Sequence, residues 1–377
     1  MRVLTVFGTR PEAIKLAPVV GELLSRRGTF DPIVAVTGQH REILDQVLSL
    51  FEVQPDYDLD IMQTGQSLTD VTTRALRGLS PVIDQSRPDV IMVQGDTTTT
   101  FAAALAAFYH RVPVAHVEAG LRTHDLMRPY PEEGNRQMTS RLTRWHFAAT
   151  PGARENLLAE GIDPSDVHVT GNTVVDALLA TRSRPFAFPP GRLSTALASG
   201  RRIILVTAHR RENWGDPLRG ICDAIAEIVT RFDDVQVLFA THPNPIVTDT
   251  AHQLLDKLDR VLLVGSQEYL AFVKLMDAAT LILSDSGGIQ EEAPALGVPT
   301  LVLRDVTERP EAIASGVAKL VGTDSARIVD EVTRLLTDEA AYASMACASN
   351  PFGDGKAATR IADLLAADSE ERYREAP

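Results

Sequence analysis

Hydrophobic and polar residues follow one another along the chain as short β-branched runs separated by longer amphipathic segments. In the first half of the chain, the runs VLTVF, PIVAVTG, DVIMVQG, VPVAHVEAG and HFAAT predict strands. Between two of these runs lies HREILDQVLSLF, in which Leu44, Val47 and Phe51 recur at helical spacing and predict a helix with one apolar face. This alternation of strands and helices predicts an α/β fold built on parallel sheets.

The alternation is interrupted at residues 182–202, where prolines, glycines and basic residues give the composition of a connection between domains. It restarts with RIILVTAHR, VQVLFATHPNP, RVLLVG, TLILSDSGG and PTLVLRD, which predict a second parallel sheet. A chain of 377 residues suits two domains of roughly 150 to 200 residues each. We therefore predict an N-terminal domain at residues 1–180, a second domain at 181–355 and a final helical segment at 356–377.

Composition restricts the partners and the compartment. The formal net charge of −13, with no basic tract, argues against nucleic acid and anionic lipid as main partners. The two cysteines, Cys222 and Cys347, form no CxxC motif and lie far apart, which fits a reducing compartment such as the cytoplasm. No apolar run approaches the roughly 20 residues of a membrane span, so no membrane partner is expected.

Polar residues concentrate where the predicted strands end, in GTRPEAIK, TGQH, QGDTTTT, HVEAGL, TAHRREN, THPNP and SDSGGIQEE. In doubly wound sheets ligands lie beyond the carboxyl ends of the strands, so these segments predict a site in a cleft between the domains. Arg10 and Lys15 flank a helix start at Pro11 and suit a phosphate or a carboxylate, although a solvated helix start has the same pattern. Neither GxGxxG nor a P-loop is present, and no Tyr is followed four residues later by Lys, which argues against NAD.

Carboxylates recur at three of these positions. Asp96 follows a strand, Glu118 shares one predicted strand face with His116, and Glu132 precedes Arg136 at a proline-bounded turn. Each carboxylate taken alone has a structural explanation, such as capping a helix. Converging on one cleft, they predict acid and base groups, because crowded carboxylates have raised or separated pKa values.

The second half predicts a nucleotide site. Ser286, Gly287 and Gly288 have the pattern of a phosphate-binding turn, and Glu292 lies where a carboxylate accepts hydrogen bonds from ribose hydroxyls. A plain helix N-terminus explains the Ser/Gly turn equally well. The histidines at strand ends, His209 and His242, lack the spacing of metal ligands; an imidazole beside an arginine suits pyrophosphate better. An amide and a ring for the base are offered by Gln267 and Phe272, the ring being equally consistent with the core.

The segments VFGTRPEAIKLAP, GQHREILDQV, GDTTTT, HVEAGLRT, PEEGNRQ, GNTVVDAL, AHRREN and SDSGGIQEEAPALGVPTLVLRDVTERPEA together resemble the non-hydrolysing UDP-N-acetylglucosamine 2-epimerases, from residue 2 to about 360. The resemblance implies a GT-B architecture of two Rossmann-like domains with an interdomain cleft. It also implies that the C-terminal helix returns to the N-terminal domain, that the protein is a homodimer, and that it converts UDP-GlcNAc reversibly to UDP-ManNAc without NAD or metal. UDP leaves first, a 2-acetamidoglucal forms, and UDP then adds back.

Site residues follow from the resemblance by position. It implies the catalytic residues Asp96, Glu118, Glu132 and His209. The implied substrate contacts are Arg10, Lys15, Arg136, Gln267, Phe272, Ser286, Gly287, Gly288, Glu292 and Arg309. In many bacterial relatives a second UDP-GlcNAc acts as activator, for which the corresponding residues are Gln39, His40, Gln46, Gln66 and His242.

Some positions depart from the family pattern, which commonly has glycine and serine where this chain has His124 and Arg128 and apolar residues where it has Thr241 and Pro243. These differences leave open an epimerase of a related UDP-sugar. The sequence is also compatible with a hydrolysing epimerase that releases UDP and ManNAc, with a GT-B glycosyltransferase and with a non-catalytic nucleotide-sugar sensor.

Overall fold

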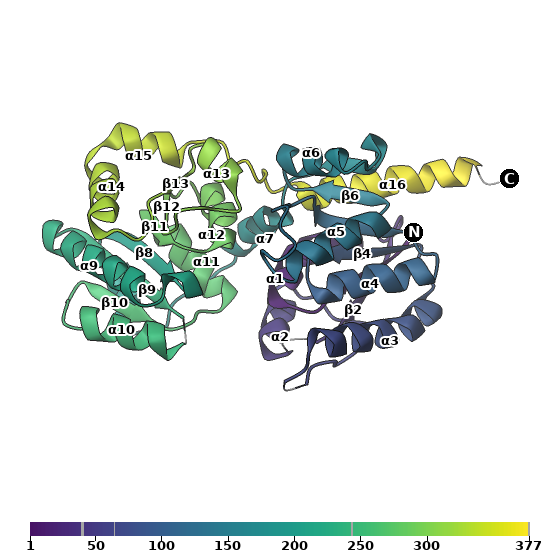
Figure 1. Cartoon of the computed structure of the whole chain (residues 1–377), viewed down its shortest axis with the longest axis horizontal. Coiled ribbons are helices and arrows are strands. Elements are labelled where there is room, and N and C mark those ends of the chain that lie inside the picture. The colour runs from purple at the N-terminus through teal and green to yellow at the C-terminus, as the bar shows by residue number, and fades with distance from the viewer. Residues whose placement is uncertain (39–40, 64, 243, 376–377) are drawn as a thin grey trace. The chain divides into compact units, whose positions relative to one another are not determined.

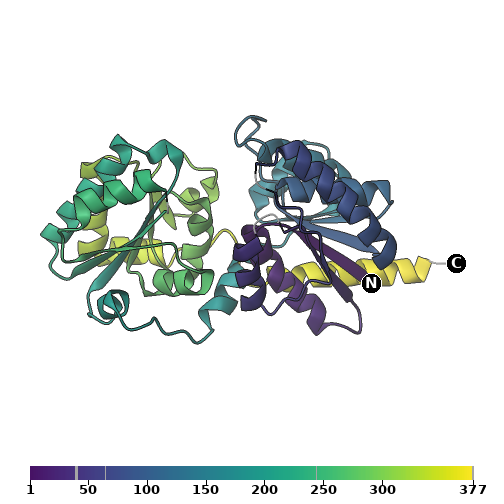
Figure 2. The same ribbon diagram turned by 90° about the horizontal axis from the view of Figure 1, so that it is seen from below.

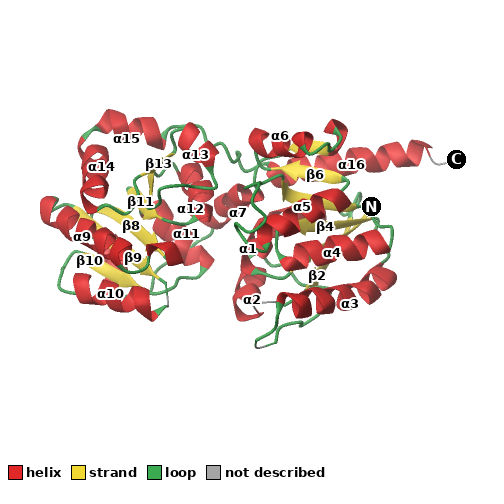
Figure 3. Ribbon diagram, in the orientation of Figure 1, coloured by secondary structure: helices red, strands yellow, loops and turns green. Residues whose placement is uncertain are grey.

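A computed structural model of the chain describes residues 1–38, 41–63, 65–242 and 244–375. The chain divides into two compact units (Figure 1). Unit 1 comprises Met1–Ala177 and the chain from Phe352 onward, and unit 2 comprises Leu178–Pro351. Each unit holds a parallel sheet with helices on its faces, as Figure 3 shows by element type, which confirms the predicted α/β class.

The sheet of unit 1 has seven strands in the order β3-β2-β1-β4-β5-β6-β7, and its neighbouring strands pair in parallel. Its strands are β1 (Arg2–Phe7), β2 (Asp31–Val36), β3 (Tyr57–Asp58), β4 (Val90–Gln94), β5 (Val114–Ala119), β6 (Trp145–Ala148) and β7 (Val167–Val169). Its helices are α1 (Arg10–Ser25), α2 (Arg41–Leu50), α3 (Leu68–Ser86), α4 (Thr98–Tyr109), α5 (Glu132–Leu142), α6 (Pro151–Ala159), η1 (Pro164–Asp166) and α16 (Ala357–Glu375).

The last helix, α16, belongs to unit 1 although it follows unit 2 in the sequence. It packs against α1, and an ion pair of 2.5 Å joins Arg26 on the α1 side to Asp363 on α16 (Figure 2). At its start, the buried Asp176 of α7 (Thr173–Arg182) accepts hydrogen bonds from the backbone N–H groups of Ala357 and Ala358. These contacts attach α16 to α1 and α7.

The sheet of unit 2 has six strands in the order β10-β9-β8-β11-β12-β13, also paired in parallel. Its strands are β8 (Arg202–Ala208), β9 (Val235–Thr241), β10 (Val261–Val264), β11 (Leu281–Ser284), β12 (Thr300–Val302) and β13 (Ala318–Leu320). Its helices are α8 (Arg192–Leu197), η2 (Arg211–Asn213), α9 (Asp216–Arg231), α10 (Pro245–Leu255), α11 (Tyr269–Ala278), α12 (Gly287–Glu292), η3 (Ala293–Leu296), α13 (Pro310–Ala314), α14 (Ser325–Thr337) and α15 (Glu339–Ala346).

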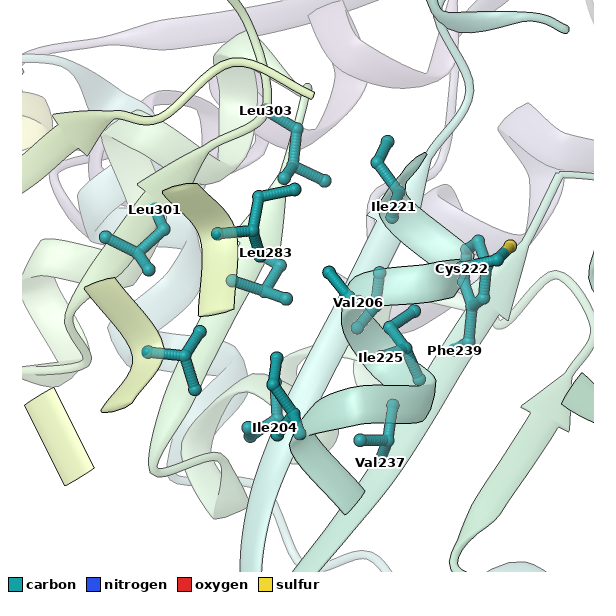
Figure 4. Close-up of a cluster of buried hydrophobic side chains, with 14 of the residues drawn as sticks. Ile204, Val206, Ile221, Cys222, Ile225, Val237, Phe239, Leu283, Leu301 and Leu303 are labelled. Atoms are coloured by element: carbon teal, nitrogen blue, oxygen red, sulfur yellow. The ribbon is translucent and has the colours of Figure 1, made fainter. Parts of the chain in front are cut away.

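β-Branched and leucine side chains build the core of unit 2. Ile204 and Val206 of β8 pack with Ile225 of α9 and Phe239 of β9, and all four are fully buried (Figure 4). This packing explains why α9 is amphipathic and why the strand runs are almost wholly apolar, since a parallel sheet is covered on both faces. Among the described residues, no helix is long and apolar enough to cross a membrane.

In both sheets the strand order reverses at the centre, between β1 and β4 in unit 1 and between β8 and β11 in unit 2. Such a topological switch point leaves a crevice beyond the carboxyl ends of the two strands, where doubly wound sheets bind their ligands. The segments GTRPE and GDTTTT follow β1 and β4, and AHRREN and SDSGG follow β8 and β11. Four of the segments singled out from the sequence therefore lie at the two switch points.

Candidate active site

At the switch point of unit 1, the β1–α1 turn is fixed by a capping box. Thr9 is the N-cap of α1, Pro11 lies in its first turn, and Glu12 accepts a hydrogen bond of 2.8 Å from the Thr9 N–H. Arg10 is the first residue of the helix and is exposed. The predicted helix start is therefore confirmed, and it leaves the Arg10 side chain accessible to an anion.

Glu118 lies near the end of β5 and is almost fully buried. Its Oε2 accepts a hydrogen bond of 2.5 Å from Lys15 Nζ and another from Gln94 Nε2 at the end of β4. The backbone of Glu118 has φ 63°, in the left-handed region that L-residues rarely adopt, and the register between β5 and β6 shifts there. A non-glycine residue held in this conformation is strained, which makes Glu118 a candidate for a functional role.

The β-bulge at Glu118 also interrupts the period-two alternation from which a face shared with His116 was predicted. His116 is fully buried and its Nε2 donates a hydrogen bond of 2.7 Å to the carbonyl of Gly95, next to Asp96. Burial lowers the pKa of His116 to about 4, so the ring is neutral near pH 7. His116 thus holds the turn that carries Asp96, and it has no charge of its own there.

Asp96 lies in the β4–α4 turn, and its side chain is 29% exposed. Arg136 of α5 lies 3.3 Å from its carboxylate and 3.4 Å from that of the buried Glu133. The amide of Asn135 donates a hydrogen bond of 3.0 Å to the Asp96 carbonyl. The α5 helix therefore holds both the backbone and the carboxylate of Asp96.

Glu132 and Glu133 begin the same helix and have different surroundings. Glu133 is fully buried and accepts hydrogen bonds from the backbone N–H groups of Thr123 and His124. Burial would raise the pKa of Glu133, but the hydrogen bonds from Gln137 and Thr123 and the charge of Arg136 outweigh it and lower the pKa. Glu132 is half-buried, and no side chain in the described parts of the chain bonds its carboxylate. Glu132 is the carboxylate predicted from the sequence, whereas the anchoring role of Glu133 was not predicted.

Unit 2 has an acid, Asp285, directly after β11, whereas the residue directly after β4 in unit 1 is Gly95. Asp285 directly follows β11, its side chain is 0% exposed, and its Oδ1 lies 2.9 Å from Nδ1 of His209. Its Oδ2 accepts hydrogen bonds of 2.9 Å from the N–H of His209, the N–H of Arg210 and the amide of Asn213. Burial alone would raise the pKa of Asp285, yet the bonds from His209 and Arg210 prevail and lower it. The charged Asp285 orients the exposed His209 ring.

The SDSGG turn connects β11 to α12. Ser286 is the N-cap of α12, and a Cβ added to Gly287 would approach Glu308 Oε1 to 3.0 Å. Glu308 in turn bonds Arg210, and although burial opposes ionisation, Arg210 and Arg304 lower its pKa to about 2. The turn is therefore in close contact with Glu308, which pairs with Arg210 and Arg304.

Glu292, at the end of α12, is buried and accepts a hydrogen bond of 2.8 Å from the hydroxyl of Tyr269. Burial and the neighbouring Glu292 raise the pKa of Tyr269 well above its usual value, so the phenol stays protonated and donates. The neighbouring Glu291 forms a buried ion pair with Arg309, the N-cap of α13. Glu291, which the sequence left without a role, thus holds a predicted nucleotide contact.

The other predicted contacts are dispersed over their units. Gln267 bonds the Gly265 carbonyl, and Phe272 is half-buried against the core formed by Val273 and Met276. The ring of His242 stacks on that of His209, with centroids 6.3 Å apart. Gln46 is exposed on α2, Gln66 accepts a hydrogen bond from the Gln63 N–H, and Gln39 and His40 lie outside the described residues.

In the described parts of the chain, no cluster of His, Cys, Asp or Glu has the geometry of a metal site. Besides Glu133 and Glu291, the acceptors or donors that hold the selected residues and were not predicted from the sequence include Glu12, Gln94, Asp285 and Tyr269. The Thr-x-x-Glu spacing of a capping box was a signal for Glu12. For the other three, the partner is distant in sequence and no local pattern marks it.

Comparisons with a family model, with the sequences of known proteins and with solved structures all lead to the same family. A family model described as UDP-N-acetylglucosamine 2-epimerase matches residues 22–366. The UDP-N-acetylglucosamine 2-epimerase of Yersinia pestis is 56% identical over 97% of this chain and 98% of that protein, and that of Escherichia coli K12 is 53% identical over 97% and 98%. The crystal structure of the UDP-GlcNAc 2-epimerase from Neisseria meningitidis bound to UDP-GlcNAc superposes with a TM-score of 0.86, at 48% identity, covering 97% of this chain and 99% of that one.

Proposed function

The chain belongs to the UDP-N-acetylglucosamine 2-epimerase family and has its GT-B-like fold class of two parallel-sheet domains; from this we propose that it interconverts UDP-GlcNAc and UDP-ManNAc without hydrolysis. The relatives support 2-epimerase activity on UDP-GlcNAc. What we add is the mechanism, elimination of UDP followed by its re-addition, and the assignment of residues to its steps.

The proposed order of events follows from the acidity of the sugar. C2 of a saturated pyranose has no adjacent carbonyl, so its proton is not acidic while the C1–O bond is intact. When UDP leaves, taking the electron pair of that bond, C1 becomes electron-deficient and the C2 proton becomes acidic. A carboxylate removes this proton and 2-acetamidoglucal forms; the return of a proton to the opposite face of C2 and of UDP to C1 completes the inversion.

Unit 1 has the groups for proton transfer. We assign Asp96, Glu118 and Glu132 as the acid and base carboxylates. Lys15 and Arg136 lie beside two of them, at 2.5 Å from Glu118 and 3.3 Å from Asp96, so each of these carboxylates has a cation as its neighbour. Arg10, exposed at the start of α1, is assigned to the pyrophosphate.

Unit 2 has the groups for the nucleotide. We assign His209 and Arg309 to the departing pyrophosphate, where donors stabilise the developing negative charge, together with the turn Ser286, Gly287 and Gly288. Glu292 is assigned to the ribose hydroxyls, and Gln267 and Phe272 to the uracil. The reaction so described needs neither NAD nor a metal ion.

The observation that carries the proposal is the division of chemistry between the two units: unit 1 has carboxylates beside cations at the ends of β4 and β5, and unit 2 has arginines paired with acids after β8 and β12. The test is incubation of the protein with UDP-GlcNAc in D2O. We expect UDP-ManNAc and deuterium at C2 of both sugars. Absence of both would exclude epimerisation of this substrate.

The same incubation distinguishes the competing activities. Stoichiometric release of UDP with ManNAc identifies a hydrolysing epimerase. Turnover only after an acceptor sugar is added identifies a glycosyltransferase, which shares the fold and the nucleotide contacts. Deuterium incorporation into another UDP-sugar but not UDP-GlcNAc identifies a related substrate, which His124 and Arg128 would then explain.

We further propose that a second UDP-GlcNAc activates the enzyme through Gln39, His40, Gln46, Gln66 and His242, and that it works as a cytoplasmic homodimer. His242 supports the first point, because its ring stacks on that of the predicted catalytic His209. With UDP-ManNAc as substrate we expect a lag that added UDP-GlcNAc abolishes. Full turnover from the start without added UDP-GlcNAc would contradict the activator site.

A further inference from the structure

One buried carboxylate in unit 1 contacts both turns of the switch point and has no role in the proposed reaction. Glu12 is 1% exposed. Its Oε2 accepts hydrogen bonds from the N–H groups of Gly8, at 3.1 Å, and Thr9, at 2.8 Å. This half of the carboxylate fixes the β1–α1 turn that carries Arg10.

The other oxygen of Glu12 reaches the neighbouring turn. Thr97 Oγ1 donates a hydrogen bond of 2.7 Å to Glu12 Oε1, and Thr100 Oγ1 lies 3.1 Å from the same atom. Thr97 is also the N-cap of α4, because its oxygen accepts a hydrogen bond from the Thr100 N–H. A single carboxylate thus links the starts of α1 and α4 across adjacent strands.

The surroundings leave this link little freedom. A Cβ on Gly8 would lie 2.1 Å from Thr37 Oγ1 and 2.8 Å from Thr99 Oγ1, so the β1–α1 turn is in contact with both neighbouring elements. Thr100 Oγ1 also donates a hydrogen bond of 2.6 Å to the Gln94 carbonyl, directly before Gly95 and Asp96. A shift of the Glu12 carboxylate would therefore move the turn that carries Asp96.

Glu12 itself is not a proton-transfer group. The polar groups around its carboxylate include two backbone N–H groups and the hydroxyls of Thr97 and Thr100, and in the described parts of the chain no ion pair joins it to a cation. Burial raises its pKa more than these hydrogen bonds lower it. Four converging polar groups around one buried carboxylate exceed what capping α1 alone requires, since the capping box uses only Oε2.

We propose that Glu12 is a positioning residue whose carboxylate sets Asp96 relative to Arg10 and Lys15 by joining the β1–α1 and β4–α4 turns. The proposal rests on the proposed epimerase function, because it assigns Glu12 an effect on the step that Asp96 performs. It predicts that the two oxygens have separable effects: breaking the Oε1 bond should displace Asp96 alone, and altering the whole carboxylate should displace Arg10 as well.

The test compares Thr97→Val, Thr97→Ser and Glu12→Gln. Thr97→Ser keeps the hydroxyl and should retain wild-type kcat, whereas Thr97→Val should lower kcat roughly 10- to 100-fold, the effect of misplacing a catalytic group by about 1 Å. UDP affinity, measured by calorimetry, should change less than about threefold in Thr97→Val, since the nucleotide contacts are intact. Glu12→Gln should lower kcat and weaken UDP binding together.

Amide hydrogen exchange tests the proposed link without relying on activity. We expect Thr97→Val and Glu12→Gln to speed exchange in residues 94–104 and to leave exchange in β8 of unit 2 unchanged. Equal kcat for Thr97→Val and Thr97→Ser would overturn the proposal and reduce Glu12 to a cap of α1. If wild-type protein exchanges no C2 proton, the proposed function fails, and unchanged exchange in residues 94–104 of both variants would separately overturn the link.

Discussion

Unit 1 and unit 2 place polar residues at equivalent points of the same topology, but their buried acids have different partners. In unit 1, Glu118 and Asp96 lie beside Lys15 and Arg136, and Asp96 keeps part of its carboxylate exposed. In unit 2 the fully buried Asp285 receives three N–H bonds and holds the exposed His209. Unit 1 thus has carboxylates paired with cations at its strand ends, and unit 2 has the cations Arg210 and Arg309 paired with the carboxylates Glu308 and Glu291.

We expect this difference to determine which part of the substrate each unit binds. The partly exposed carboxylate of Asp96 is accessible for proton exchange, whereas Asp285, which is fully buried and accepts three N–H bonds, serves as a fixed charge. Arg309, held by Glu291, and Arg210, held by Glu308, present guanidinium groups suited to phosphoryl oxygens. One strand order supports both roles, because the chemistry lies in the turns after the strands.

The largest effect is expected from removing a carboxylate that we assign to proton transfer in unit 1. Asp96→Asn should lower kcat about 1,000-fold, because the loss of a general acid or base costs roughly 10²- to 10⁴-fold. UDP affinity should stay within about threefold of wild type, since the nucleotide residues are unchanged. Deuterium exchange at C2 and calorimetry with UDP measure the two quantities.

The matched control for Asp96→Asn is Glu155→Gln, which removes an exposed carboxylate from α6 of the same unit. It should leave both kcat and UDP affinity unchanged. Equal activity of Asp96→Asn and wild type would remove Asp96 from the proton-transfer step and leave Glu118 and Glu132 as the candidates.

A second, smaller effect is expected from removing an acid that pairs with a cation in unit 2. Glu291→Gln leaves Arg309 without the charge of its buried partner, and losing one member of such a pair costs about 3 kcal/mol or more. We expect a lower free energy of unfolding of unit 2 and at least roughly tenfold weaker UDP binding, with a smaller change in kcat at saturating substrate. Calorimetric melting and UDP titration measure these effects.

Glu331→Gln is the control for Glu291→Gln, because Glu331 pairs with Lys319 and Arg334 elsewhere in unit 2. Its UDP affinity should equal that of wild type. A comparable loss of UDP affinity in both variants would show that Glu291 affects binding only through stability.

Much of this comparison could be predicted from the sequence, and its limits have physical causes. The β-branched runs predicted the main strands, and the polar segments after them located the turns, because period and turn chemistry are local properties. The left-handed φ of Glu118 could not be predicted, since alternation assumes an unbroken strand and the bulge depends on pairing with β6. The short strands β7 and β13, with the sequences VHV and AKL, lack the longer apolar run that surrounds the equally short β12 and gave no strand signal.

Partners distant in sequence were missed for a similar reason. Glu291 and Arg309 are recognisable as a pair only after α12 and α13 are brought together. The segment 182–202, predicted as a connection, contains the short helix α8, which packs against β10. Tertiary contacts determine these features, and the local pattern carries no information about them.

A third effect concerns how the stability of each unit depends on pH. Unit 1 buries His116 and His146 side by side on β5 and β6, whereas His209, His242 and His252 of unit 2 are all exposed. Burial lowers the pKa of His116 to about 4 and that of His146 to about 3, from 6.5. Between these values the unfolded chain binds more protons than the folded one, so unit 1 loses stability as pH falls below about 6.5.

From pH 7 to pH 5 each histidine should cost unit 1 roughly 2 kcal/mol of unfolding free energy. The fluorescence of Trp145, next to His146, reports unit 1 in a Trp214→Phe background, in which urea unfolding is followed at both pH values. His146→Leu should reduce the unfolding free energy lost between pH 7 and pH 5 by the contribution of one histidine. His252→Asn, on the surface of unit 2, should not alter this loss. An unchanged loss in His146→Leu would contradict the assignment.

The smallest effect concerns how unit 2 orients the carboxylate assigned to ribose. Tyr269→Phe removes the hydroxyl that donates to Glu292 at 2.8 Å, and losing such a hydrogen bond costs about 1 kcal/mol, or roughly fivefold in UDP affinity. Tyr342→Phe is the matched control, because its hydroxyl bonds the Thr280 carbonyl away from Glu292 and its loss should leave UDP binding unchanged. The comparison of UDP with 2′,3′-dideoxy-UDP decides the interpretation. If Glu292 accepts from the ribose hydroxyls, Tyr269→Phe weakens UDP but not the dideoxy analogue; an equal loss for both ligands would instead place Tyr269 in general support of the fold.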